Sequence, residues 1–447
     1  CGPDYIDPMF HSRVLGTPSR NLDTFFTGEE TTRYLFANSA KHAGISVMEG
    51  VMGLYDGVGG ITDQASAYDL ARVTDTPVIL IVNAKGMSLS LIPFLKGFVD
   101  YQRADGRVIQ GVILNRATKM TSMLLKEKIE QETGLKLIGY VPELTACRVE
   151  SRHLGLVTPG EIQDLQTRME ELAGELEKSL DFDALLAIAE HARDYPDEAG
   201  DIPKEVSDVL QVQQSPEGKR AISKTATSEC SGSLRIAVAK DEAFCFYYQD
   251  NLETLEAMNA ELRFFSPIHD EKVPGEADGL YLGGGYPELY GKELSENASM
   301  RASVRELLAQ GMPCIAECGG YLYLKQELAD ADGISWPMCG VLPGGSRDSG
   351  RLSRFGYGIM TAMGDSVLGP VGTSVPAHEF HHWDSPENGD CFSFKKPVGT
   401  REWSCGYGTE SLYAGFPHLY FYGHEPVRFL ELAARRRDGE CGRSHRT

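Results

Sequence analysis

Short apolar runs alternate with segments of helical spacing along most of the chain. In the first half, four runs predict buried strands: Ile45–Met48, Val78–Val82, Val108–Leu114 and Leu137–Val141. Met120–Thr133, between two of these runs, carries helical spacing. Continuous apolar strands that alternate with helices are typical of a parallel sheet covered on both faces. We therefore expect an α/β fold.

The composition changes in the middle of the chain and suggests two domains. A long amphipathic stretch, about residues 159 to 191, closes the first half, and residues 195–233 are rich in Pro, Gly, Ser, Glu and Lys. A second series follows, with expected strands at Arg235–Ala239, Leu262–Phe265, Gly279–Leu282 and Cys314–Ala316 and expected helices at Asn251–Asn259 and Glu293–Ala309. No series of Asn-Gly hairpin turns, typical of all-β folds, is evident. The expected domains are residues 1–194 and 234–447, joined by a linker over 195–233.

Charge and cysteine usage exclude several classes of protein. The formal net charge is −21, which argues against a nucleic-acid partner, because phosphate binding needs a basic surface. No apolar run is long enough to predict a membrane span. The ten cysteines are scattered and form no C-x-x-C pair, so they predict reduced thiols in the cytoplasm rather than a zinc site or a disulfide framework. The one assembly we consider is a homodimer.

Cys318 is the candidate nucleophile. The segment Pro313–Leu324 predicts a strand, a tight turn at Cys318 and a helix, and Gly319 and Gly320 remove side chains where such a turn is crowded. A strand–turn–helix elbow lifts a nucleophile above the sheet edge. The helix N-terminus is expected to lower the pKa of the thiol. The structural alternative is a buried cysteine before a glycine-rich turn.

Two further features complete a candidate site for nucleophilic catalysis. The strand Ala277–Leu282 runs into Gly283, Gly284 and Gly285, whose backbone amides suit an oxyanion hole. The nucleophile also needs a base, and His381 and His418 both qualify. Spacing alone does not choose between them.

Acidic residues gather in the N-terminal half. Asp4 and Asp7 lie in the opening segment, Glu49 follows the apolar run Ile45–Met48, and Asp56 lies in the glycine-rich loop beyond it. Ligands of open α/β sheets bind outside the carboxyl ends of the strands, and Mg²⁺ takes few carboxylates together with nucleotide phosphates. Each carboxylate alone is as well explained as a cap or a turn residue.

The C-terminal motifs carry a specific resemblance. They are Gly283–Glu288, Glu317–Tyr321, Phe355–Gly358 and His378–His381. With these motifs the C-terminal half resembles the flavodoxin-like, triad-type (class I) glutamine amidotransferase domain of cobyrinate a,c-diamide synthases. In that family the base lies in a Tyr-x-His-x-His-Phe motif that maps to His418. Phe416 and Tyr420 depart from the motif and no Glu follows His418 at the second position, so the resemblance implies a Cys–His dyad.

The N-terminal half resembles the other domain of the same synthases, a P-loop-type sheet similar to dethiobiotin synthetase. The matches are in Val82–Ser90, Gly111–Arg116 and Glu150–Val157, besides the acidic segments. The resemblance implies that Asp4, Asp7 and Asp56 bind ATP or the corrinoid, that Asn115 lies near the nucleotide base and that Glu49 binds Mg²⁺.

The implied reaction is the amidation of the a and c carboxylates of cobyrinate in cobalamin biosynthesis. ATP phosphorylates a carboxylate of the corrinoid, and ammonia attacks the acyl phosphate. Glutamine supplies the ammonia through a thioester on Cys318. ATP and glutamine are the co-substrates, and Mg²⁺ is the metal.

One motif of that family is missing. No G-x-x-x-x-G-K-[ST] occurs in the 447 residues. We therefore expect a chain truncated before the end of strand 2 of that domain, without its first strand and phosphate loop. Such a fragment would hydrolyse glutamine weakly and would not amidate. The alternatives are a related substrate (Ni-sirohydrochlorin, hydrogenobyrinate or the side chains amidated by cobyric acid synthase) and a non-catalytic module that binds a corrinoid or a partner.

Overall fold

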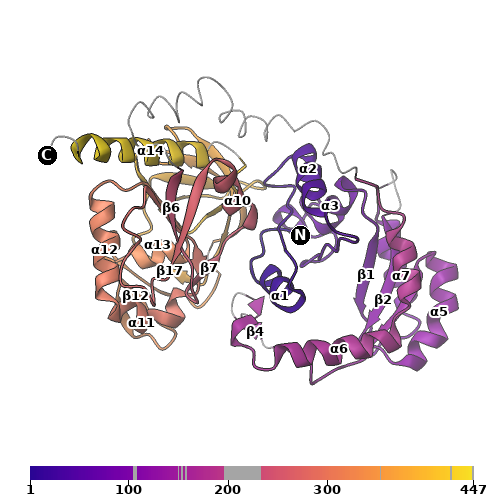
Figure 1. The fold of residues 1–447 in the computed structure, drawn as a ribbon. Helices are drawn as coiled ribbons and strands as arrows, with labels where there is room; N and C mark the ends of the chain where they lie inside the picture. The colour runs from indigo at the N-terminus through magenta and orange to yellow at the C-terminus, as the bar shows by residue number, and fades with distance from the viewer. Residues whose placement is uncertain are drawn as a thin grey trace. The chain divides into compact units, whose positions relative to one another are not determined.

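The computed structural model describes residues 1–103, 108–149, 151–152, 155–156, 159–195, 233–352, 354–422 and 425–444. The chain divides into two compact units, which Figure 1 colours from indigo to yellow. The first comprises Cys1–Thr24 and Gly28–Asp201, and the second comprises Phe25–Thr27 and Ile202–Thr447. The linker expected over 195–233 lies outside the described residues, apart from its two ends.

The first unit is built on a parallel three-stranded sheet. Its strands, in the order β1-β2-β3, are β1 (Val78–Asn83), β2 (Ile109–Asn115) and β3 (Lys136–Val141). One face packs against α3 (Ala67–Val73), α4 (Leu91–Asp100) and α5 (Lys119–Thr133), and the other against α7 (Phe182–Ala189). Three of the four strands expected in this half are thus confirmed, as is the helix at 120–133.

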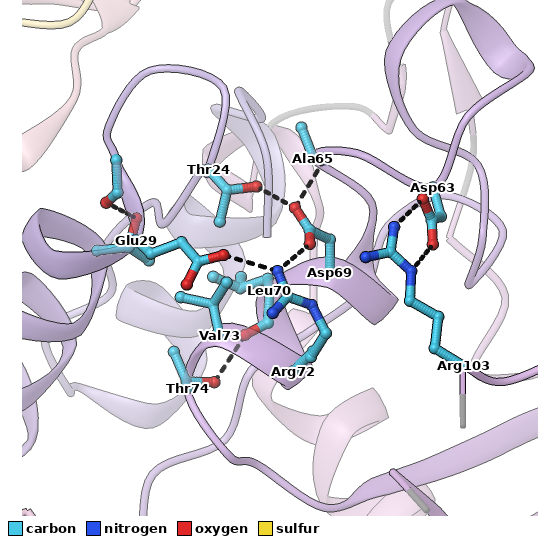
Figure 2. A network of polar contacts seen from close by, with 12 residues as sticks. Thr24, Glu29, Asp63, Ala65, Asp69, Leu70, Arg72, Val73, Thr74 and Arg103 are labelled. Atoms are coloured by element: carbon cyan, nitrogen blue, oxygen red, sulfur yellow. Dashed lines mark hydrogen bonds and ion pairs between the residues drawn. The ribbon is translucent and has the colours of Figure 1, made fainter. Parts of the chain in front are cut away.

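Helices α1 (Ile6–Leu15) and α2 (Glu29–Ala40) and the 3-10 turn η1 (Val58–Gly60) precede this sheet. A polar network ties this region to α3 (Figure 2). Arg72 donates from the same guanidinium nitrogen to Asp69 at 2.9 Å and to Glu29 at 2.8 Å. Asp69 also accepts from Thr24 Oγ1 at 2.9 Å and from the amide of Ala65 at 3.1 Å. The buried Asp69 carboxylate is therefore well supplied with hydrogen-bond donors.

One strand expected in the first unit is wrong. Ile45–Met48 forms no strand; it pairs with no other described segment, and Ile45 and Val47 are exposed. An apolar run becomes a strand only where a neighbour takes up its backbone hydrogen bonds. The amphipathic stretch at 159–191 contains η2 (Pro159–Glu161), α6 (Leu165–Ser179) and α7, and Asp181 caps α7 by accepting from the amide of Ala184 at 3.0 Å.

A six-stranded sheet forms the centre of the second unit. Its order is β20-β21-β11-β9-β6-β8, and all neighbours run parallel except β20 and β21. The strands are β6 (Leu234–Ala239), β8 (Ala260–Phe265), β9 (Gly279–Leu282), β11 (Cys314–Glu317), β20 (Tyr407–Thr409) and β21 (Leu412–Gly415). The four strands expected in this half are confirmed.

Different elements cover the two faces of this sheet (Figure 1). One hydrophobic cluster includes α11 (Gly291–Glu296), α12 (Ala298–Ala309) and α13 (Gly319–Leu324), and the other includes α10 (Gln249–Ala257) and α14 (Glu425–Ser444). The helix expected at Glu293–Ala309 is two helices. They meet at Asn297, whose side chain accepts from the amide of Met300 at 3.2 Å and so caps α12.

Antiparallel structure between residues 327 and 419 is not anticipated by the sequence analysis. A five-stranded sheet has the order β19-β18-β15-β16-β22, with β15 (Phe355–Ala362), β16 (Ser374–Phe380), β18 (Phe392–Lys395), β19 (Glu402–Cys405) and β22 (His418–Leu419). A second sheet joins β12 (Glu327–Ala329), β13 (Ser335–Pro337), β14 (Gly345–Asp348) and β17 (Trp383–Asp384). A short pair, β7 (Phe244–Phe246) and β10 (Gly284–Gly285), lies beside the central sheet. The longest, β15, alternates buried and more exposed residues, unlike the continuous apolar runs of the parallel strands.

Candidate active site

Cys318 occupies a strained turn between β11 and α13. Its φ of 44° and ψ of −100° lie in a region that side chains rarely adopt. The amide of Cys318 donates to the carbonyl of Gly415 at 2.8 Å, which ties the turn to the end of β21. The expected strand–turn–helix elbow is therefore present, and neighbouring structure holds it in place.

The glycine after the turn is required by close packing. A Cβ at Gly320 would lie 2.2 Å from the carbonyl oxygen of Leu282, at the end of β9. The amide of Gly320 donates to the carbonyl of Gly283 at 2.9 Å. The first turn of α13 thus presses directly on the strand that precedes the glycine triplet.

The expected lowering of the Cys318 pKa is wrong. Burial raises the pKa of the thiol well above its ordinary value, the carboxylates of Glu288 and Glu379 add to the effect, and a hydrogen bond from the Gly319 amide opposes it only in part. Helix α13 has only six residues, and the side chain of Cys318 is buried. Desolvation therefore outweighs the helix terminus, and the resting group is a thiol.

Three neighbouring strands bring the candidate residues to one edge of the central sheet. The strands β9, β11 and β21 are adjacent and parallel, so their carboxyl ends lie side by side. Gly283 follows β9, Cys318 follows β11, and His418 lies three residues beyond β21. A Cβ at Gly284 would lie 2.6 Å from Cε1 of His418, so the histidine ring packs onto the glycine triplet.

The three glycines differ in their surroundings. The amide of Gly283 donates to the hydroxyl of Tyr247 at 2.8 Å. The amide nitrogen of Gly285 lies 3.0 Å from the position that a Cβ at Gly319 would take. Of these two amides, the one at Gly285 is thus next to the nucleophile turn, while the one at Gly283 already has an acceptor.

His418 is buried at the first position of β22, opposite His378 of β16. Its Nδ1 lies 3.8 Å from Oε2 of Glu317. Burial, with smaller contributions from His418 and Lys396, lowers the pKa of His378 to about 3, so His378 is neutral. The carboxylate beside His418 comes from the residue before the nucleophile, not from a position after the histidine where the sequence analysis looked for it.

His381 has both ring nitrogens engaged by acceptors. Nδ1 lies 2.6 Å from the carbonyl oxygen of Trp383, and Nε2 lies 2.8 Å from Oε1 of Glu379. The ring also stacks on Phe416, with the centroids 3.6 Å apart. Both nitrogens are thus held by neighbouring oxygens, so His381 is poorly placed to act as a base for Cys318.

Glu379 is the centre of a buried charge network. Besides His381, it accepts from Arg354 Nε at 3.0 Å and from Trp403 Nε1 at 3.2 Å. Arg354 also pairs with Asp384. The side chain of Glu379 has no exposed surface. The histidine-rich motif at 378–381 thus contributes a structural network, whose partners the sequence analysis did not identify.

In the first unit, the opening acidic residues form a cluster with His11. Asp4 accepts from the amides of Ile6 at 3.1 Å and Asp7 at 3.0 Å, at the start of α1. Glu49 lies 2.6 Å from Nε2 of His11. Partial burial, followed by the charges of Asp4 and Glu49, raises the pKa of Asp7 to about 6. Glu49 follows irregular backbone, not the strand that the sequence analysis expected.

Asn115 lies elsewhere in this unit, at the carboxyl end of β2 and paired with Asn83 at the end of β1. Beyond these strands, Glu143 receives Lys85 at 3.0 Å and Arg116 at 2.6 Å. Neither Lys85 nor Glu143 is among the site residues predicted from the sequence. Lys85, Arg116 and Glu143 lie near Asn115, beyond the carboxyl ends of the parallel strands, where open α/β folds bind ligands.

The remaining acidic residue, Asp56, is exposed in a turn in which its amide donates to the carbonyl of Gly53 at 2.8 Å. Within the part of the chain that the structure describes, no group of three or more His, Cys, Asp or Glu residues is arranged to hold a metal ion. No helix among the described residues is long and apolar enough to cross a membrane.

The candidate residues lie beyond the carboxyl ends of three adjacent parallel strands, and the second unit contains a glutamine amidotransferase domain. Residues 235–425 match the family described as the CobB/CobQ-like glutamine amidotransferase domain. The similarity to known proteins extends well beyond this domain, over both units of the chain. The chain belongs to the cobyrinate a,c-diamide synthase family, as three relatives with that name show.

The relative from Caldanaerobacter subterraneus is 35% identical over 96% of this chain and 90% of its own length. The one from Listeria innocua is 37% identical over 98% of this chain and 92% of its own length. The one from Listeria monocytogenes is 38% identical over 94% of this chain and 88% of its own length. The protein is accordingly a glutamine-dependent carbon–nitrogen ligase.

Proposed function

We propose that Cys318 hydrolyses glutamine with His418 as its base. The thiol adds to the side-chain amide carbon of glutamine while His418 takes the thiol proton and passes it to the leaving ammonia. This forms a γ-glutamyl thioester. Water then attacks the thioester, His418 takes a proton from the water, and glutamate leaves as the thiol is regenerated.

The raised pKa of Cys318 supports the need for a base. A buried thiol that rests in its protonated form cannot attack until the proton is removed. His381 is occupied on both nitrogens, which leaves His418 as the better candidate of the two. The single observation that carries the proposal is that Cys318 directly follows β11, while His418 lies three residues beyond β21, the parallel strand paired with β11.

The glycine triplet is the proposed oxyanion hole. Amides from Gly283, Gly284 and Gly285 would stabilise the negative oxygen of the tetrahedral intermediate. Gly285 is the member beside the nucleophile turn, and Gly284 is the member against which His418 packs. Gly283 could join only if its amide left the hydroxyl of Tyr247.

The ammonia is proposed to amidate the a and c carboxylates of cobyrinate, each activated with ATP as an acyl phosphate. Asp4, Asp7, Asp56 and Asn115 are proposed to bind ATP or the corrinoid. This rests on the family and on the position of Asn115 at the carboxyl edge of the parallel sheet.

Mg²⁺ would be held by Glu49. The support for a cation here is electrostatic: burial, followed by the charges of Asp4 and Glu49, raises the pKa of Asp7, and a cation would relieve the repulsion among these carboxylates. When bound, the ion would neutralise phosphate charge. Asp4 would continue to cap α1, so Asp7 is the second carboxylate able to turn toward such an ion.

We also propose that the enzyme acts in the cytoplasm, in keeping with its scattered thiols, and that its assembly is a homodimer. Light scattering of the purified protein tests the second point. A monomer at working concentrations would contradict it.

The experiment that tests the glutaminase measures glutamate released from glutamine by the chain and by Cys318→Ala. We expect the variant to lose activity by about 10³-fold or more. His418→Ala should lose activity comparably, whereas His381→Ala should show its effect first on stability. Equal activity of the wild type and Cys318→Ala would contradict the proposal.

The acceptor is tested with full-length protein by mass spectrometry. Cobyrinate, hydrogenobyrinate and Ni-sirohydrochlorin are each incubated with ATP and glutamine, and the amides added are counted. Two amides on cobyrinate support the proposal. Amidation of either other compound in preference to cobyrinate would contradict the proposed substrate.

A further inference from the structure

Glu317 is a wholly buried carboxylate directly before the nucleophile. It is the last residue of β11, and its side chain is 1% exposed. Side chains alternate along a strand, so Glu317 and Cys318 leave the backbone in different directions. An enclosed carboxylate is costly unless donors and charges compensate for it. Its partners therefore indicate why it is there.

The partners of Glu317 converge on the segment that carries His418. Oε1 accepts from the amide of Leu419 at 3.0 Å, and Oε2 accepts from the hydroxyl of Tyr281 at 3.1 Å. Oε2 also lies 3.8 Å from Nδ1 of His418. One carboxylate thus holds the backbone of β22 with one oxygen and faces the imidazole with the other.

The groups around the two residues differ in the charge that they bring to the histidine. His378, across from His418 on β16, has a lowered pKa and is neutral. Glu288, Glu379 and, more weakly, Glu317 raise the pKa of Cys318, and Glu379 is paired with Arg354 and His381. Glu317 is the carboxylate whose oxygen faces Nδ1 of His418.

We propose that Glu317 is the positioning residue of the glutaminase: it orients the His418 ring through Nδ1 and stabilises the imidazolium formed when the thiol proton is taken. This rests on the proposed function of Cys318 and His418. At 3.8 Å the pair is longer than a hydrogen bond, and a closing movement of about 1 Å would bring Nδ1 into hydrogen-bonding range of the carboxylate.

The alternative is that Glu317 only anchors the strand end through Leu419. Glu317→Gln separates the two roles, because an amide keeps an acceptor for Leu419 and loses the charge. Tyr281→Phe is the matched control, because it removes a hydrogen bond to the same oxygen and keeps the charge. Glu317→Asp keeps the charge on a shorter side chain.

The experiment measures kcat and KM for glutamine hydrolysis by the full chain over a range of pH. For Glu317→Gln we expect kcat to fall about 10²-fold with KM nearly unchanged. The acid limb of its pH profile should move to lower pH, because the imidazolium loses its counter-charge. Tyr281→Phe should change kcat by less than about 5-fold, and Glu317→Asp should lie between the wild type and Glu317→Gln.

A Glu317→Gln enzyme with wild-type kcat and an unmoved acid limb would overturn the proposal and leave Glu317 as a strand anchor. If Glu317→Gln does not fold, Glu317→Asp decides: a lowered kcat at constant KM supports the proposal, and wild-type kinetics overturns it. Failure of the glutaminase itself looks different, because the wild type and Cys318→Ala would then be equally inactive.

Discussion

Two carboxylates of this molecule are each placed between two basic side chains, one in each unit. Glu379 of the second unit pairs with Arg354 and His381, and its side chain has no exposed surface. Glu143 of the first unit pairs with Lys85 and Arg116, and its side chain is 52% exposed. Water screens the ion pairs of Glu143 and is excluded from those of Glu379.

The difference shows what each part of the molecule is arranged to do. Around Cys318, charges are paired and buried before any substrate arrives, so the proposed catalytic groups are held in fixed positions. At the carboxyl edge of the first sheet, charged groups face solvent, where a ligand could displace one salt bridge and form another. The predictions below set buried groups of the second unit against exposed groups of the first.

The largest effect is expected from Glu379→Ala. Removal of the carboxylate leaves the buried His381 without its acidic partner and Arg354 with Asp384 alone, which should lower the free energy of unfolding by roughly 3–5 kcal/mol. All three tryptophans, Trp336, Trp383 and Trp403, lie in the second unit, so tryptophan fluorescence in urea reports this unit alone. Glu143→Ala is the control and should leave the unfolding curve by circular dichroism unchanged. A comparable loss in both variants would contradict the comparison.

Glycine substitutions should have opposite signs in the two units. A Cβ at Gly320 would overlap the carbonyl of Leu282, so Gly320→Ala should cost up to about 3 kcal/mol and reduce glutamine hydrolysis. Gly174 lies within α6 with open space around it, so Gly174→Ala should stabilise the first unit by about 0.5–1 kcal/mol. Denaturant unfolding measures both, and a neutral Gly320→Ala would show that the elbow can move.

Acid should destabilise the second unit through His378. The pKa of His378 is about 3 in the folded protein and 6.5 ordinarily. Between these pH values the unfolded chain binds a proton at His378 and the folded protein does not. Between pH 6.5 and pH 5 this should cost about 2 kcal/mol, with further loss toward pH 3. His378→Asn should flatten this dependence in the fluorescence-monitored unfolding. An equal slope in wild type and variant would exclude His378 as the cause.

The smallest effect is expected in the first unit, at Asp7. Its pKa is raised from 3.8 to about 6, so ionisation is disfavoured in the fold and stability is lost as the pH rises through that window. Asp7 is partly exposed, so Asp7→Asn should gain less than about 1 kcal/mol at pH 7.5 and nothing below pH 3.8. Thermal unfolding by circular dichroism at both pH values measures the gain. A gain at low pH would point to another cause.

The sequence predicted elements whose partners lie nearby in the chain or whose apolar runs are continuous. Strands β1, β2, β3, β9 and β11 and the elbow at Cys318 are of this kind. Ile45–Met48 has the same apolar character and forms no strand. Whether an apolar run becomes a strand depends on a neighbouring strand to pair with, and the composition of the run does not reveal that neighbour. The strands β15 to β19 were missed because alternating half-buried segments carry a weaker signal than continuous apolar runs.

The candidate site was predictable by residue type, but its charges were not. The helix terminus suggested a lowered pKa for Cys318, yet burial raises it, and burial follows from packing that the sequence does not specify. Glu317 was overlooked because an acid was sought near His418 in the sequence, whereas the two meet across neighbouring strand ends. A charged residue that ends an apolar strand was the available signal.

The pairing of β11 with β21 also governs when the site can form. Cys314 pairs with Leu412, about 100 residues later in the chain. At ordinary rates of translation, β21 is therefore synthesised roughly 5–20 s after β11, the strand before the proposed nucleophile. Until then the thiol has neither its buried surroundings nor His418. A newly made chain therefore passes through a period in which Cys318 is open to oxidants, and the last stretch of synthesis closes it.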